Sequence, residues 1–335
     1  MGGVGRYSER LARGLAELVD LTIVTLADPV KLPTVTYVCL PIASSRLKRY
    51  YATPLRARRI VTDTRPDVVH AHGDDWALSH RTPILRSFYG SSWGEAMSST
   101  GLRRLNHMLL AATEIVSARR ADLRVGIAPE SQERFRCHAL TPPFVPAQAV
   151  PSPSPHPAPT AVFIGSFRGR KQGWIAQAAV ERLRLSTHPE SRLVVIGPSE
   201  DAGEWAPWVE HCSGLTDAEV LGRLSEAWLL LSPSAYEGFG IPVVEGLQSY
   251  LPVVAMDNPG SRYVRSQGTS DLPLWLEPNQ PTFVERVEGV VSQGPYLNPA
   301  QTAAATSLVE QFAALGSPEM ILRLYRSLLE ASHND

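Results

Sequence analysis

Two glutamates flank a glycine turn in residues 237–245, which read EGFGIPVVE. The apolar run 228–231 before them predicts a buried strand, and Pro242 suits the first turn of a helix. The glycines therefore precede a helix N-terminus, where unpaired N–H groups and the positive end of the helix dipole favour phosphate. Because carboxylates repel phosphate, Glu237 and Glu245 need another partner, and sugar hydroxyls donate hydrogen bonds to ionised carboxylates. The alternative is an ordinary strand, turn and helix with solvated glutamates.

A second predicted anion site lies in residues 161–171. The apolar run 161–164 predicts a strand, Gly165 a turn, and Arg170 and Lys171 stand at the start of a helix that reaches about Leu185. Arginine offers a planar pair of donors and lysine a point charge. Since cations oppose the dipole at a helix start, an anion is expected there; a solvated basic pair is the alternative.

Residues 237–245 resemble the signature of the retaining glycosyltransferases of family 4, which have the two-domain GT-B fold. The resemblance implies that Glu237 contacts the donor sugar and takes part in catalysis, and that Glu245 holds the ribose hydroxyls of the nucleotide. It also implies that the backbone amides of Gly240 and Ile241 hold the diphosphate, with Phe239 next to them at the donor.

The chain departs from the family pattern at three places. In the family, a Gly-Arg pair is usually followed by a Lys five residues after the Arg, and both cations contact the diphosphate. Here Lys171 matches the lysine, but Ser166 replaces the arginine. Arg168 or Arg170 would then supply the missing charge. Tyr89 stands where the family often has a histidine against the donor sugar. Either the Tyr89 hydroxyl makes the hydrogen bond that the imidazole makes in the family, or the site of this chain differs from the family pattern. Residues 257–263 are predicted to form a loop, in which the family often has a glutamate where this chain has Tyr263.

The chain begins with a glycine turn, Gly2 and Gly3, followed by an amphipathic helix. In the family this turn faces the diphosphate and follows a buried first strand. We therefore expect Gly3 at the donor and a first strand missing from the start of this sequence.

The N-terminal half alternates short β-rich runs with helical stretches, which predicts parallel βαβ units with ligands beyond the strand C-termini. The polar residues after these strands are expected on the acceptor side: His70, His72, Asp74, Asp75, Tyr89, Ser91, Ser92 and Glu95. A lone histidine at a strand end is usually structural.

These patterns predict an α/β protein of two doubly wound, Rossmann-like domains facing across a cleft. The N-terminal, acceptor-binding domain spans 1–145 and a proline-rich linker spans 146–160. The donor-binding domain spans 161–315, and a last helix, 316–335, packs back toward the first domain.

Composition sets further bounds. A net charge of -1 over 335 residues gives no reason to expect nucleic acid, and three scattered cysteines indicate neither a disulfide framework nor a zinc site. No apolar run of transmembrane length or signal peptide is present, which favours the cytoplasm. Between 46 and 59 six basic residues and no acid alternate with Leu and Tyr. This segment could rest on the inner face of a membrane as a peripheral contact; a solvated helix face is the alternative.

The predicted activity is transfer of a sugar, with retained configuration, from a nucleotide-diphosphate sugar to a saccharide, lipid-linked or small-molecule hydroxyl. Neither a metal nor another cofactor is expected, because helix N-termini with Arg170 and Lys171 can neutralise the diphosphate. One alternative is a sugar-nucleotide epimerase, which needs acids on both sides of the sugar, with Asp74, Asp75 and Glu95 as candidates. Another is a non-catalytic nucleotide-sugar-binding protein.

Overall fold

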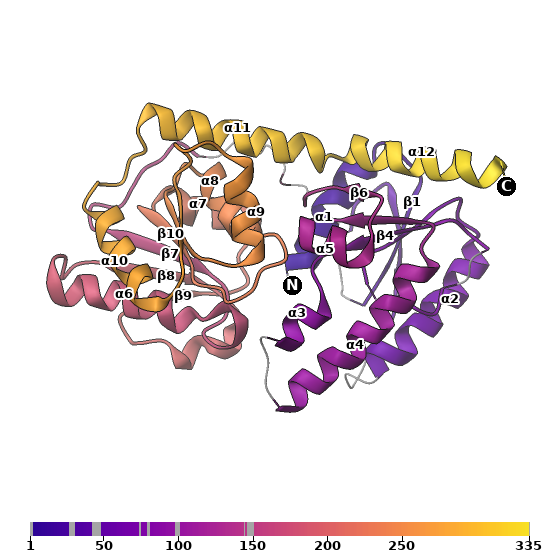
Figure 1. Cartoon of the computed structure of the whole chain (residues 1–335), viewed down its shortest axis with the longest axis horizontal. Coiled ribbons are helices and arrows are strands. Elements are labelled where there is room, and N and C mark those ends of the chain that lie inside the picture. Colours follow the sequence, from indigo (N-terminus) through magenta and orange to yellow (C-terminus); the bar gives the residue numbers. More distant parts are fainter. Residues whose placement is uncertain are drawn as a thin grey trace. The chain divides into compact units, whose positions relative to one another are not determined.

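The computed structural model describes residues 3–26, 31–41, 48–73, 75–78, 81–97, 101–143, 145 and 151–334, with only the backbone of 3, 4, 6, 103, 333 and 334. The chain divides into unit 1, Met1–Pro146 with Phe312–Asp335, and unit 2, Ala147–Gln311. Each unit contains parallel strands covered by helices (Figure 1). The predicted α/β class with two Rossmann-like domains is confirmed.

Unit 2 is built on one six-stranded parallel sheet. Its strands are β7 Thr160–Ile164, β8 Arg192–Ile196, β9 Glu210–Cys212, β10 Leu229–Ser232, β11 Val253–Met256 and β12 Leu274–Glu277. Its helices are the 3₁₀ turns η2 Gly169–Lys171 and η3 Ser199–Glu204, then α6 Gly173–Ser186, α7 Asp217–Ser225, α8 Ile241–Gln248, α9 Pro259–Gln267 and α10 Gln280–Val291, together with α11 Pro299–Leu315 as far as Gln311. The strand order β12-β11-β10-β7-β8-β9 reverses direction between β7 and β10. Ligands of such sheets bind outside the strand C-termini at this switch point.

The two faces of this sheet are covered by different helices. Alternate strand residues, such as Leu229 and Leu231, pack in one core with α6 and α10. Leu230 points to the opposite face, where it lies against Gly246 of α8; a Cβ on that glycine would come within 3.2 Å of it. Figure 1 shows α6 and α10 together on one side of the sheet and α8 and α9 on the other. The near-continuous apolar sequence of the strands follows from burial on both faces.

Unit 1 contains two parallel sheets. The first pairs β1 Leu21–Thr25 with β2 Val35–Cys39, and the second has the order β3 Val69–Ala71, β4 Ile84–Phe88, β5 Leu123–Gly126 and β6 Ala139–Leu140. Its helices are α1 Gly3–Leu15, the π-helical turn η1 Lys48–Ala52, α2 Thr53–Thr64, α3 Ser92–Met97, α4 Gly101–Arg120, α5 Pro129–Phe135 and α12 Pro318–Asn334. Gly2 lies outside the described residues, as do Asp74 and residues 146–150 of the expected linker, and the missing first strand stays a prediction.

The last helix belongs to unit 1 and closes two of its cores. Ile321 of α12 packs against Tyr7, Leu11 and Leu15 of α1. Further along, Leu328 packs on the strands β4 and β5. On the other face of β4, Ile84 joins a separate core with the loop after β3 and the end of α4. Helices thus cover both faces of this sheet, as parallel strands require. Among the described residues, no helix has the length and apolarity to cross a bilayer.

Two local predictions were wrong. Arg170 and Lys171 do not lie in the first turn of a helix; they form η2, and α6 begins only at Gly173 because Gln172 adopts a left-handed conformation with φ 49°. Residues 257–263 are not a loop throughout, because α9 begins at Pro259. Asn258 caps it by accepting a hydrogen bond from the Ser261 amide at 3.0 Å, and proline suits the first helical position.

Candidate functional site

The two predicted anion sites lie side by side in unit 2. Strands β7 and β10 are hydrogen-bonded neighbours in parallel register, with Phe163 opposite Leu231. Their C-terminal loops therefore leave the sheet at the same edge. The amide of Ala235 donates to the carbonyl of Arg170 at 2.8 Å, which fixes one loop on the other. Together the loops form one site at the switch point of the sheet.

Glu237 is the centre of this site and is only 6% exposed. Lys171 Nζ donates to its Oε1 at 2.5 Å and Arg170 donates to its Oε2 at 3.0 Å. Arg170 also donates to the carbonyl of Tyr236 at 3.1 Å. Burial raises the pKa of Glu237, but Lys171, Arg170 and the Ser234 hydroxyl outweigh burial and hold the pKa at about 2. The carboxylate is thus ionised at neutral pH, with two cations on its two oxygens.

The glycine turn after Glu237 depends on two glycines, one for its backbone conformation and one for a close approach. Gly240 has φ 95°, a left-handed conformation that favours glycine, and it directly precedes α8. Gly260 at the start of α9 donates its N–H to the carbonyl of Glu237 at 3.0 Å. A Cβ on Gly260 would lie 2.7 Å from the backbone of Phe239, so only glycine fits there. The turn and the N-termini of α8 and α9 are thereby held together.

The other predicted donor residues occupy distinct positions around the turn. Glu245 is buried in α8, one turn after Ile241 and on the same side of the helix. Phe239 is 2% exposed, and its ring centroid lies 6.0 Å from that of Tyr263, so its side chain packs beneath the turn. Gly240 and Ile241 form the junction of turn and helix, where the backbone can present N–H groups to an anion.

Ser166, Arg168 and Arg170 occupy different positions relative to Glu237. The Ser166 hydroxyl donates to the carbonyl of Arg168 at 3.0 Å. Arg168 itself is largely exposed and pairs with Glu204 of η3, away from Glu237. Of the two arginines considered as replacements for the family arginine, Arg170 is the one at Glu237.

Two residues that support the position of Glu237 were not predicted from the sequence. Asn258 is buried and donates to the carbonyl of Ser234 at 2.9 Å, while capping α9. Ser234 in turn hydrogen-bonds Glu237. The Asn-Pro-Gly sequence after the apolar run 253–256 is a typical helix start and could have indicated this support.

A second polar cluster lies in unit 1, at the C-terminal ends of β3 and β4. His72 Nδ1 hydrogen-bonds the Tyr89 hydroxyl, and His70 bonds the Tyr325 hydroxyl at 2.7 Å and Ser87 Oγ at 2.8 Å. Burial, with Arg86 adding to it, lowers the pKa of His72 to about 3; burial also lowers the pKa of His70. Both imidazoles are therefore neutral, so Nδ1 of His72 can accept a hydrogen bond from the Tyr89 hydroxyl.

Asp75 and Glu95, the predicted acidic residues of unit 1 that the structure describes, have other partners. Asp75 and Arg86 form a buried ion pair at 3.1 Å. Glu95 of α3 lies 3.5 Å from His107 Nδ1. Because the buried Asp75 carboxylate is engaged by Arg86, this geometry disfavours Asp75 in the epimerase alternative. Gly3 is the first residue of α1, and its contact with a donor stays a prediction.

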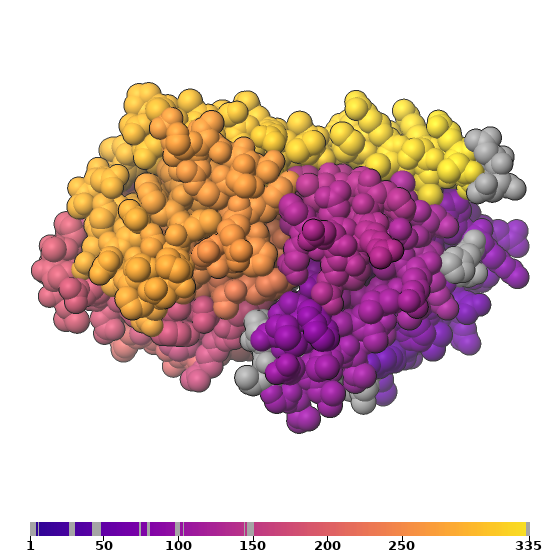
Figure 2. Space-filling view, viewed as in Figure 1, coloured from indigo at the N-terminus to yellow at the C-terminus, as the bar shows by residue number. Residues whose placement is uncertain are grey.

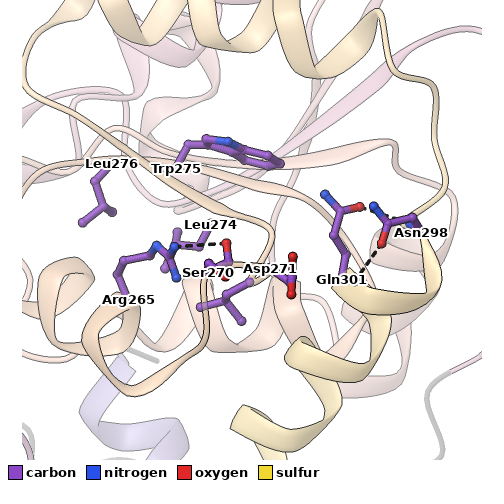
Figure 3. Close-up of a pocket in the computed structure, with 9 residues that line it drawn as sticks. Arg265, Ser270, Asp271, Leu274, Trp275, Leu276, Asn298 and Gln301 are labelled. Carbon is purple, nitrogen blue, oxygen red and sulfur yellow. Dashed lines mark hydrogen bonds between the residues drawn. The ribbon is translucent and has the colours of Figure 1, made fainter.

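Among the described residues, no three His, Cys, Asp or Glu side chains gather in a metal-binding group. A cavity of about 430 Å³ lies elsewhere in unit 2, along the edge strand β12 and the start of α11 (Figure 3). Arg265 is one of its lining residues and donates to the carbonyl of Ser270 at 3.3 Å. None of its lining residues belongs to the site around Glu237.

Comparison with known proteins gives two family matches. The model described as Glycosyltransferase Family 4 matches residues 1–145, and that described as Glycosyl transferases group 1 matches residues 158–293. A glycogen synthase of Mycobacterium tuberculosis is 26% identical over 238 residues, which are 60% of this chain and 55% of that protein. An MMP alpha-(1->4)-mannosyltransferase of Mycolicibacterium hassiacum is 39% identical over 85 residues, 23% of this chain and 20% of that one. The chain thus spans about half or less of these relatives.

Solved structures agree in fold. Sucrose-phosphate synthase from Thermosynechococcus elongatus has a TM-score of 0.78 at 16% identity, covering 98% of this chain and 94% of that one. Anabaena HepE in complex with UDP-glucose has a TM-score of 0.73 at 12% identity, covering 99% and 96%. Identities this low carry the fold alone.

Proposed function

The chain belongs to the glycosyltransferases of family 4, and we propose that it moves a hexosyl group from a nucleotide-diphosphate sugar to a hydroxyl acceptor with retained configuration. The acceptor is a saccharide, a lipid-linked sugar or a small molecule. The observation that carries the proposal is Glu237 with Arg170 and Lys171 at the switch point of the unit 2 sheet, beside the N-terminus of α8. The solved complex of HepE with UDP-glucose supports a nucleotide sugar as the donor.

The proposed donor contacts follow from charge. Two cations face one carboxylate, which leaves an excess positive charge for the diphosphate. The N-terminus of α8, with Gly240 and Ile241, adds N–H donors, so charge neutralisation needs no metal ion in this proposal. Glu237 then faces the sugar hydroxyls, and Glu245 accepts hydrogen bonds from the ribose.

The proposed chemistry asks the protein for position and charge. The leaving diphosphate assists the acceptor hydroxyl as it attacks on the same face of the sugar, while Arg170 and Lys171 stabilise the charge that develops on the leaving group. The Tyr89 hydroxyl is held by hydrogen bonds with His72, Ser8, Ser87 and Tyr7, and in this proposal it contacts a sugar hydroxyl.

The location of the protein is also a proposal. The chain works in the cytoplasm, and the basic segment 46–59 contacts an anionic membrane surface. Within that segment Lys48, Arg49, Arg56, Arg58 and Arg59 are exposed, whereas Arg46 lies outside the described residues. Each such cation near an anionic surface contributes about 1 kcal/mol.

The test is a transfer assay with nucleotide sugars and mixed acceptors, read by release of free nucleoside diphosphate and by the anomeric configuration of the product. A transferase releases the diphosphate and forms a glycoside. An epimerase would form a new nucleotide sugar without free diphosphate, and a binding protein would form neither. Lys171→Met should abolish release, whereas Glu204→Gln, which removes the exposed Arg168 pair, should not.

A further inference from the structure

The long helix α4 presents large apolar side chains to solvent. Leu102 is 86% exposed, Leu105 55% and Leu109 52%. Met108, Ile115 and Val116 on the same helix, and Trp93 and Met97 on α3, are exposed as well. We call these eight residues the α4 face. Isolated exposed leucines are ordinary, but a contiguous set of this kind on one helix marks an interaction site.

The contacts on the inward side of α4 explain why its large apolar side chains face solvent. Ala111 and Ser117 are buried there, and Glu114 accepts hydrogen bonds from the Ser92 amide at 3.0 Å and its hydroxyl at 2.7 Å. At the end of the helix Arg120 donates to the carbonyl of Trp76. Rotating the helix to bury its leucines would break these contacts. The usual amphipathic arrangement is thus inverted in α4.

The charges at the exposed positions described on α4 are positive, and the acid on the α3 part of the face, Glu95, lies 3.5 Å from His107 Nδ1. Arg104 and Arg119 are the charged residues at the exposed positions that the structure describes on α4, and its sole acid is the half-buried Glu114. Trp76 joins this helix to the basic segment, because its indole also donates to the carbonyl of Tyr50 in η1 at 3.0 Å. Residues 48 to 59 of that segment include five exposed cations and no acid, and the exposed Asp63 follows on α2.

We propose that the α4 face inserts into the headgroup region of an anionic bilayer, with Arg104, Arg119 and the basic segment on the lipid phosphates. An apolar helix face flanked by arginines is typical of helices that lie in the interface of a membrane. A second copy of the chain fits less well, since a two-fold interface sets each patch against its own copy and would bring these cations together. Figures 1 and 2 show α4 at the outer boundary of unit 1. The inference rests on the membrane contact proposed above and adds the apolar part of it.

The experiment is flotation of the full chain with vesicles of phosphatidylglycerol and phosphatidylcholine, and with phosphatidylcholine alone. The wild type should float with the anionic vesicles and far less with the neutral ones. Leu105→Ser combined with Leu109→Ser should lower the partition coefficient at least about tenfold, because two inserted leucines are lost. The matched control, Leu185→Ser with Tyr296→Ser, removes two residues of unit 2 that are 82% and 68% exposed and should float as the wild type does.

Other outcomes overturn the inference. If the leucine variant floats like the wild type, but Arg56→Gln with Arg59→Gln does not float, the basic segment binds lipid without the α4 face. If the wild type stays in solution and instead dimerises in a way that the leucine variant abolishes, the face joins two copies. If neither flotation nor dimerisation occurs, both membrane proposals fail, while nucleotide binding by unit 2 is unaffected.

Discussion

Replacing Glu237 by glutamine should change how the stability of unit 2 depends on pH. The native pKa of about 2, against the ordinary value of 4.5, corresponds to about 3 kcal/mol of unfolding free energy at ~1.4 kcal/mol per pH unit. Because the native pKa is the lower one, this contribution is fully present above pH 4.5 and is lost as the pH falls from 4.5 to about 2. By pH 3 about 2 of the 3 kcal/mol should be gone.

Urea unfolding followed by tryptophan fluorescence measures this directly, since five of the seven tryptophans, Trp174, Trp205, Trp208, Trp228 and Trp275, lie in unit 2. Glu237→Gln should be less stable than the wild type by about 3 kcal/mol at pH 7 and by only about 1 kcal/mol at pH 3. Glu204→Gln, which breaks an exposed pair, should cost under about 1 kcal/mol. A difference between wild type and Glu237→Gln that stays constant from pH 7 to pH 3 would refute the ionic role assigned to Glu237.

Three further predictions concern the rest of the site. Glu245→Ala should weaken nucleoside diphosphate binding about tenfold to a hundredfold in calorimetry, because a charged hydrogen bond to the ribose contributes about 1.5–3 kcal/mol; an unchanged affinity would contradict the ribose contact. Gly260→Ala should lower the melting temperature, since its Cβ meets fixed backbone, whereas Gly289→Ala, which meets nothing within 4 Å, should keep or raise it. Tyr89→Phe should lower kcat for transfer and leave nucleoside diphosphate affinity unchanged; equal loss in both would place Tyr89 at the nucleotide instead.

The local structure of the donor site could be predicted from the sequence. An apolar run, a glycine turn and a proline-started helix predicted a strand and a helix around 237–245, and β10 and α8 confirm both elements. Strand and helix are fixed here by neighbours in sequence, through burial, glycine freedom and proline geometry.

The ion pairs of Glu237 could not be predicted in this way. Lys171 and Glu237 are 66 residues apart, and they meet because β7 and β10 are neighbours at the reversal of strand order. Similarly, His72 meets Tyr89 because β3 and β4 run in parallel register. Strand order is a property of the assembled sheet, which periodicity along the chain does not specify.

Helix α4 shows a different limit of prediction from the sequence. In the sequence, Leu102, Leu105, Leu109 and Ile115 are spaced to lie on roughly one face of a helix, and α4 has that face. Periodicity alone does not say whether such a face points to the core or to solvent. Here the hydrogen bonds of Glu114 and Arg120 decide the direction.

The central claim is that the site at the ends of β7 and β10 binds a nucleoside diphosphate through Arg170 and Lys171. The most direct measurement is a thermal-shift comparison of wild type and Lys171→Met with UDP, GDP, ADP and dTDP. A ligand at a hundred times its Kd adds about 2.7 kcal/mol to the folded state, so one nucleotide should clearly raise the Tm of the wild type and leave that of Lys171→Met nearly unchanged. No shift with any of the four, or equal shifts in both proteins, would contradict the account.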